Sequence, residues 1–260
     1  MENAKLFKEE LLKRNVKNST NLNLQSLRLG INSVIALSNP KTLANYRKLE
    51  KLTLADNAVT DYGMHAIKTI INITKMSSLN LASNMISGEG LETILDDLIS
   101  NNSIKTLDLG VVETSMRKNS LGIQGAVCIA ALLIRNKTLQ NLSISDNDFG
   151  PDGGECIGVA LSQNDTLKSL RISENELKSE GAIPIIDSAT KLESLNLAKN
   201  FLKSDVGKHL QKLLKRSTTL KSLNIEFNEL TVPGIKAISQ GVSKNASLEI
   251  LNVKGNIIGD

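Results

Sequence analysis

Aliphatic residues recur along the chain in one short pattern, L-x-x-L-x-L-x-x-N, where L is any aliphatic residue or Met and x is mostly polar. Nine stretches follow it, and in the fourth stretch extra residues precede the Asn. Successive copies begin 25 to 28 residues apart, except for one step of 35 residues. They begin at Leu24, Leu49, Met76, Ile104, Leu139, Leu167, Leu192, Leu220 and Leu248. A period of this length predicts a repeat protein, in which each unit packs on its neighbours.

Each copy predicts a strand followed by a helix. Leucines two residues apart lie on one face of a strand, so L-x-L is a short strand with one buried face. Beyond the Asn, aliphatic residues and a Gly recur at fixed distances. In the fourth copy these are Leu121, Gly125, Ala126, Ile129 and Leu133. Spacings of three and four residues place them on one face of a helix. Stacking the copies buries the apolar faces of both elements.

Such a stack must bend. Neighbouring strands lie about 4.8 Å apart, whereas packed helices need about 8 to 10 Å. The strands therefore take the inside of the curve. We expect an α/β solenoid shaped like a horseshoe, with a parallel β-sheet on the concave face and helices on the convex face.

An Asn closes every copy. Its side-chain amide both donates and accepts hydrogen bonds, so stacked copies can pair the backbone groups of successive buried turns. We expect a structural ladder formed by Asn32, Asn57, Asn84, Asn119, Asn147, Asn175, Asn200, Asn228 and Asn256.

These motifs resemble the leucine-rich repeat, and the period of about 28 residues resembles its ribonuclease-inhibitor-like subclass. The resemblance covers residues 24–260 as nine repeats, of which the last is incomplete. Residues 1–23 are expected to form a lead-in and an N-terminal capping helix over residues 3–15. The sequence stops soon after the ninth Asn, which favours a fragment of a longer solenoid or an end covered by a partner.

The fourth copy carries an insertion of seven residues, at about 112–118. We expect it to bulge outward, because the strand and the ladder on either side of it are fixed. Loops on rigid scaffolds often carry function. The candidates for contacts with a partner are Met116, Arg117 and Lys118. The alternative is a tolerated surface insertion.

The expected concave face is where the copies differ from one another. Its centre is small, polar and somewhat acidic. The candidate partner-binding residues are Arg28, Asp56, Asn80, Asp108, Asp146, Arg171, Glu174, Asn196, Lys199, Asn224, Glu226 and Phe227. The carboxylates favour a partner protein with a basic patch. The alternative is a solvated sheet surface whose real contacts lie elsewhere.

No catalytic or metal-binding constellation stands out. The residues best suited to such chemistry lie apart or without companions, namely His65, His209, Cys128 and Cys156. The stretch SISDNDFGPDGGE, at residues 143–155, suggests calcium. An EF-hand loop starting at Asp146 would need Gly and Glu where Pro151 and Ile157 stand. We therefore expect no catalytic residue, no metal and no cofactor.

The net charge and the lengths of the apolar runs limit the partners and the cellular location that we expect. The net charge is +4, and basic residues are spread along the chain without a block of like charges. Because phosphate contacts need Lys and Arg, an acidic concave face argues against binding of nucleic acid.

The apolar run over residues 126–134 is too short to span a bilayer, which needs about 20 residues. The charged N-terminus lacks a secretory signal. We expect a cytoplasmic, intracellular protein without a membrane contact.

The leading functional hypothesis is a non-catalytic protein–protein interaction module that binds a partner protein on its concave face and takes no small-molecule substrate. The resemblance implies the same, because ribonuclease-inhibitor-like repeats mostly bind proteins. Two alternatives stay open. One is a GTPase-activating protein similar to the Ran GTPase activators, although their acidic tail is absent here. The other is a pathogen effector delivered into a host cell, or an oligomerising scaffold, built on the same repeats.

Overall fold

A computed structural model describes residues 19–46 and 48–257 of the chain, so the expected capping helix over residues 3–15 lies outside the described residues. Nine short strands form one parallel sheet, in which each strand pairs with its neighbours in sequence. The strands are β1 (Asn21–Asn23), β2 (Lys51–Thr53), β3 (Ser78–Asn80), β4 (Thr106–Asp108), β5 (Asn141–Ser143), β6 (Ser169–Arg171), β7 (Ser194–Asn196), β8 (Ser222–Asn224) and β9 (Ile250–Asn252).

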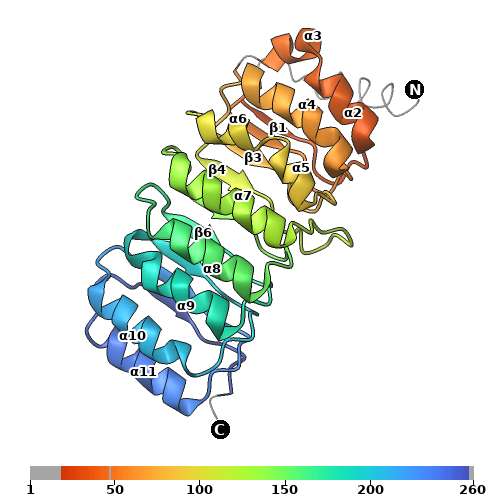
Figure 1. Cartoon of the computed structure of the whole chain (residues 1–260). Coiled ribbons are helices and arrows are strands. Elements are labelled where there is room, and N and C mark those ends of the chain that lie inside the picture. Colours follow the sequence, from red (N-terminus) through yellow and green to blue (C-terminus); the bar gives the residue numbers. More distant parts are fainter. Residues whose placement is uncertain (1–18, 47, 258–260) are drawn as a thin grey trace.

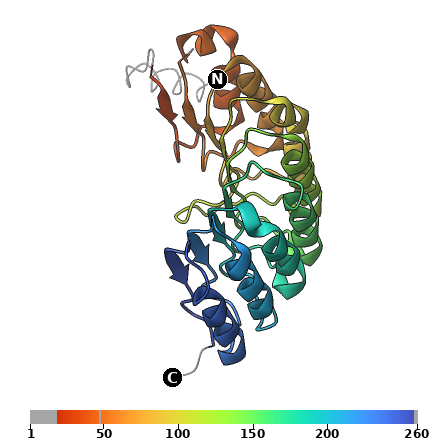
Figure 2. The same cartoon turned by 90° about the vertical axis from the view of Figure 1, so that its left-hand side faces the viewer.

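Helices connect the strands and cover one side of the sheet (Figure 1). They are α2 (Gly30–Ser38), α3 (Pro40–Leu43), α4 (Thr60–Ile73), α5 (Gly88–Glu92), α6 (Leu95–Ser100), α7 (Gly122–Arg135), α8 (Gly150–Leu161), α9 (Lys178–Ser188), α10 (Val206–Arg216) and α11 (Val232–Val242). Two single 3₁₀ turns, η1 (Ala44–Tyr46) and η2 (Ala189–Lys191), follow α3 and α9. The strands line the inside of the resulting arc and the helices line its outside (Figure 2). This is the predicted α/β solenoid.

The core lies between the sheet and the helices. A Leu stands at the centre of every strand, and the register sets these leucines opposite one another, from Leu22 against Leu52 to Leu223 against Leu251. They meet the aliphatic face of each helix, such as Ile129 and Leu133 of α7, which are at most 1% exposed. Each repeat thus buries its strand and its helix against the neighbouring repeats, as the two periodicities predict.

A column of Asn side chains runs along the buried turns that follow the strands. Asn175 illustrates the pattern. Its Oδ1 accepts the backbone N–H of Asn147 at 2.9 Å, and its Nδ2 donates to the carbonyls of Ile144 and Ser173 at 3.0 and 2.9 Å. The Asn175 amide therefore ties its own turn to the turn and the strand end of the preceding repeat. The ladder positions are Asn57, Asn84, Asn119, Asn147, Asn175, Asn200, Asn228 and Asn256.

The expectation for the first repeat was wrong. Strand β1 is centred on Leu22, five residues before the position that the pattern starting at Leu24 implied. Leu27 takes the ladder place, where its N–H donates to Asn57 Oδ1 at 3.1 Å. Asn32 instead lies exposed in helix α2. The amide of a ladder Asn also donates to the preceding repeat, and no described strand precedes β1. An Asn is therefore not needed at the first turn, and Leu can replace it.

Two asparagines that the sequence pattern treats alike are expected to differ sharply in stability. Asn175→Ala leaves buried N–H and C=O groups without partners and should lower the free energy of unfolding by about 3 kcal/mol. Asn32→Ala, on an exposed helix face, should change it by less than about 0.5 kcal/mol. Urea unfolding followed by circular dichroism measures both. Equal effects of the two substitutions would contradict the ladder.

Candidate functional site: the inner face and the turn edge of the sheet

The third residue of each strand points away from the helices, toward the inside of the arc. Five predicted site residues lie at this place, namely Asn80, Asp108, Arg171, Asn196 and Asn224. Some of these side chains bond to a neighbouring strand or within their own repeat. Asn80 Nδ2 donates to Asp108 Oδ2 at 3.2 Å, and Asn224 Nδ2 donates to Glu226 at 3.1 Å. The inner face is thus a polar surface whose side chains partly satisfy one another.

A second surface follows the ladder itself. We define the turn edge as the residues immediately before and after each ladder position. Many of them have positive φ although they are not Gly. These are Ser26, Arg28, Asp56, Ala58, Ser83, Met85, Asp146, Asp148, Glu174, Glu176, Lys199, Phe201 and Phe227. The tight turn imposes this backbone, so the side chains project from the edge of the sheet at fixed places.

Several predicted residues belong to the turn edge. Asp56, Asp146, Glu174, Lys199 and Phe227 each stand directly before a ladder Asn. Lys199 Nζ lies 3.1 Å from Glu174 Oε1, so two of the candidates neutralise each other.

Arg28 was expected on a strand. The shifted first repeat moves it to the turn, one residue after Leu27, with a φ of 53°. Sequence reasoning did not single out the residues after the ladder position, among them Met85, Asp148 and Phe201. The repeated pattern of positive φ that defines them cannot be read from the pattern of apolar residues.

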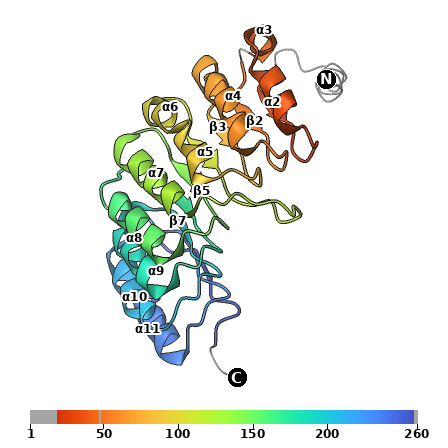
Figure 3. The same ribbon diagram turned by 45° about the vertical axis from the view of Figure 1, so that its right-hand side comes forward.

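The insertion projects from the stack and is held to the scaffold by side-chain contacts. We call residues 112–118 the strap. It leaves the end of β4 and projects on the strand side of the arc (Figure 3). The backbone N–H of Val112 donates to Ser83 Oγ at 2.8 Å. The strap then reaches the second repeat at one end and the fifth at the other. Electrostatic attraction holds the strap at both repeats, because its basic and hydroxyl side chains pair there with carboxylates.

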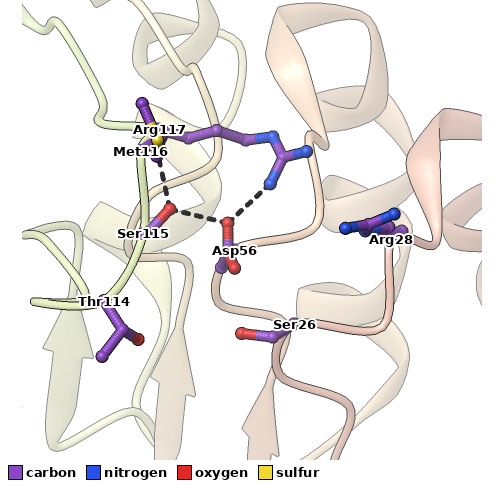
Figure 4. A pocket seen from close by; sticks show the side chains of 7 residues that line it. All are labelled: Ser26, Arg28, Asp56, Thr114, Ser115, Met116 and Arg117. Atoms are coloured by element: carbon purple, nitrogen blue, oxygen red, sulfur yellow. Dashed lines mark hydrogen bonds and ion pairs between the residues drawn. The ribbon is translucent and has the colours of Figure 1, made fainter.

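At the second repeat, the strap closes on Asp56 (Figure 4). Ser115 Oγ donates to Asp56 Oδ1 at 2.7 Å, and the Arg117 guanidinium approaches the same oxygen to 2.8 Å. Burial alone would raise the pKa of Asp56, but hydrogen bonds from Ser115, Arg117 and Ser26 lower it below the ordinary Asp value. With Arg28, Thr114 and Met116, these residues line an open pocket of ≈ 420 Å³.

At the fifth repeat, Lys118 lies between two carboxylates. Its Nζ is 2.8 Å from Asp148 Oδ1 and 3.3 Å from Asp146 Oδ1. The hydrogen bond to Asp148 raises the pKa of Lys118, and the same bond lowers that of Asp148. The pairings with Asp56 and Asp148, whose pKa values are lowered, stabilise the strap. This stabilisation is fully present when the pH is above the ordinary Asp pKa of about 3.9. This stabilisation is lost as the pH falls through the lowered value.

Three predicted strap residues therefore play different parts. Arg117 and Lys118 hold the strap to the scaffold through Asp56, Asp146 and Asp148. Met116 is fully exposed at the tip.

Groups that could support catalysis are dispersed. His65 is exposed on α4, and His209 Nδ1 lies 3.0 Å from Asp187. Burial raises the pKa of the Cys128 thiol, with a further contribution from Glu92, which disfavours a reactive thiolate. Within residues 19–46 and 48–257, no three His, Cys, Asp or Glu side chains gather as metal ligands. In the same range, no helix is long and apolar enough to cross a membrane.

Comparison with known proteins supports the assignment of the leucine-rich repeat. The family model described as "Leucine Rich repeat" matches four segments, over residues 72–95, 135–158, 163–185 and 216–239. No curated protein matches the chain. Among solved structures, the chain is similar to Leiomodin-1 Actin-Binding Site 2 (ABS2), with 22% identity and a TM-score of 0.44, over 74% of this chain and 90% of that one.

The strap is expected to open when Asp56 loses its charge. Trypsin must take Arg117 into its specificity pocket, which the ion pair with Asp56 prevents. Asp56→Asn should therefore raise the rate of cleavage after Arg117 roughly tenfold. Asp152→Asn, at an exposed acid on α8, removes the same charge elsewhere and should leave the rate unchanged. Mass spectrometry of the fragments measures both. An unchanged rate in the Asp56 variant would show that the ion pair does not hold the strap.

Proposed function

Because this chain is a leucine-rich repeat protein, we propose that it is a non-catalytic module that binds another protein along the inner face and the turn edge of its sheet. The scaffold is preformed, so a large partner can be bound with little loss of conformational entropy. The observation that best supports this proposal is a pair of exposed aromatic side chains in the seventh and eighth repeats.

Phe201 and Phe227 lie on the turn edge with φ of 57° and 50°. For a bulky residue this backbone is strained, and Gly or Asn would adopt it at lower cost. Both rings are also half exposed, at 51% and 47%. The fold therefore gains little from an aromatic side chain at either place. Strain and exposure together at one edge point to a role in binding.

The Phe227 ring is held in place while it stays open to solvent. It lies over Gly255, where an added Cβ would come within 2.3 Å of the ring. Lys254 Nζ lies 5.8 Å from the ring centroid, in a cation–π contact. A rigid, half-exposed ring loses little freedom on binding, which is what a good interface anchor needs.

Carboxylates around the two rings favour a basic partner. Glu176 and Glu229 are exposed directly after ladder positions. Hydrogen bonds from Asn224 and Asn252, opposed by burial, lower the pKa of Glu226 and keep it ionised. We therefore propose a partner segment that places an apolar side chain against Phe201 and Phe227, with Lys or Arg beside it. Such complementary charges favour fast and specific association.

The double substitution Phe201→Ala and Phe227→Ala should weaken partner binding roughly tenfold or more. It should leave the unfolding midpoint nearly unchanged, because both side chains are half exposed and their removal opens no buried cavity. The matched control is Ile123→Ala with Val127→Ala, which removes two similarly exposed apolar side chains from helix α7 on the outer face.

The partner is first captured with the intact chain and identified, and its dissociation constant is then measured by calorimetry for each purified variant. Equal weakening by both double variants, or none by the Phe variant, would refute the proposal.

A further inference from the structure

Helix α10 concentrates the positive charge of the molecule. Its eleven residues include Lys208, Lys212, Lys215 and Arg216 and no acidic residue, which gives a charge of +4. The formal net charge of the whole chain is also +4. The rest of the molecule is therefore balanced, and one helix carries the excess.

All four cations lie on the exposed side of α10. Its opposite side is fixed in the core, where Leu210, Leu213 and Leu214 are fully buried. The helix therefore cannot turn its apolar face outward, and only its charged face meets solvent. Figures 1 and 2 show α10 on the outer side of the arc, away from the strands.

These charges are not neutralised locally. None of the three lysines forms an ion pair with another described residue, and Arg216 donates only to the backbone carbonyl of Asp187, at 3.4 Å. Lys208 and Lys212 stand four residues apart, as do Lys212 and Arg216, so like charges are neighbours on one face. Like charges at this spacing destabilise a helix slightly. Proximity to the helix C-terminus offsets this only for Lys215 and Arg216.

Helix α11 extends the same surface. It packs against α10, and Gln211 Nε2 donates to Gln240 Oε1 at 2.7 Å across the two helices. Lys236 is exposed on α11, and Val232 at its start is 55% exposed. Neither helix carries a Phe, Tyr or Trp, and the imidazole of His209 on α10 is paired with Asp187. The surface therefore lacks the exposed aromatic platform on which nucleic-acid bases stack.

We propose that the outer face of α10 and α11 contacts the surface of a bilayer rich in anionic lipids. The contact is peripheral and electrostatic, with lysine side chains reaching the lipid headgroups and the helix core remaining in the protein. Because this face is opposite the strands, a membrane-bound molecule keeps its inner face open to a partner. The inference is independent of the protein-binding function proposed above.

The test is sedimentation of the full chain with vesicles of phosphatidylcholine, either pure or mixed with phosphatidylserine. We expect binding only to the mixed vesicles, decreasing as salt is raised. Lys208→Glu with Lys212→Glu should weaken binding roughly tenfold or more, and Lys208→Gln with Lys212→Gln should weaken it less. The control is Lys51→Glu with Lys105→Glu, which makes the same change of net charge at exposed residues on the strand side.

Three results would overturn the proposal. The first is no preference for vesicles that contain phosphatidylserine. The second is equal loss of binding in the α10 variant and in the strand-side control, since net charge alone would then explain it. The third is salt-dependent binding to a single-stranded RNA homopolymer without binding to the vesicles, which would assign the face to nucleic acid instead.

Discussion

Every strand of this sheet ends in a turn that buries backbone N–H and C=O groups, and each of these groups needs a hydrogen-bond partner. From the second repeat on, one Asn amide per repeat meets that need, because it bonds to its own turn and to the preceding repeat. The same turn geometry therefore recurs along the arc, with left-handed backbone on both sides of Asn57, Asn84, Asn147, Asn175 and Asn200. Side chains at these places project at regular intervals from a fixed edge. The chain can vary them without changing the scaffold.

The insertion interrupts this column and also spans the interruption. Asn147 Oδ1 is buried and is the one ladder oxygen without a hydrogen-bond partner in the described structure, because the N–H of Asn119 does not reach it. The strap that follows β4 pairs with Asp56 on one side of this break and with Asp146 on the other. Ion pairs at the surface thus connect repeats at the point where the amide column is weakest. The same pairs neutralise two carboxylates of the turn edge, Asp56 and Asp146.

Most of the architecture could be predicted from the sequence, because strand and helix periodicities repeat and each copy supports the others. The first repeat could not, since Leu22, Leu24 and Leu27 fit the pattern as well as the later leucines do. Asn32 alone favoured the wrong register, and the first turn of a stack does not need a ladder Asn. The course of the strap depends on pairings between distant residues. The basic face of α10 was not predicted because apolar residues separate most of its cations, so they form no block of like charge in the sequence.

The account depends most on the amide column, and native-state hydrogen exchange measures it residue by residue. The backbone amides of Asn57, Asn147, Asn175 and Asn200 each donate to the next ladder side chain. We predict that they exchange as slowly as amides of the central strands, and that the amide of Asn119, at the break, exchanges faster. Fast exchange at all these positions, at the rate of an exposed loop, would contradict the central claim.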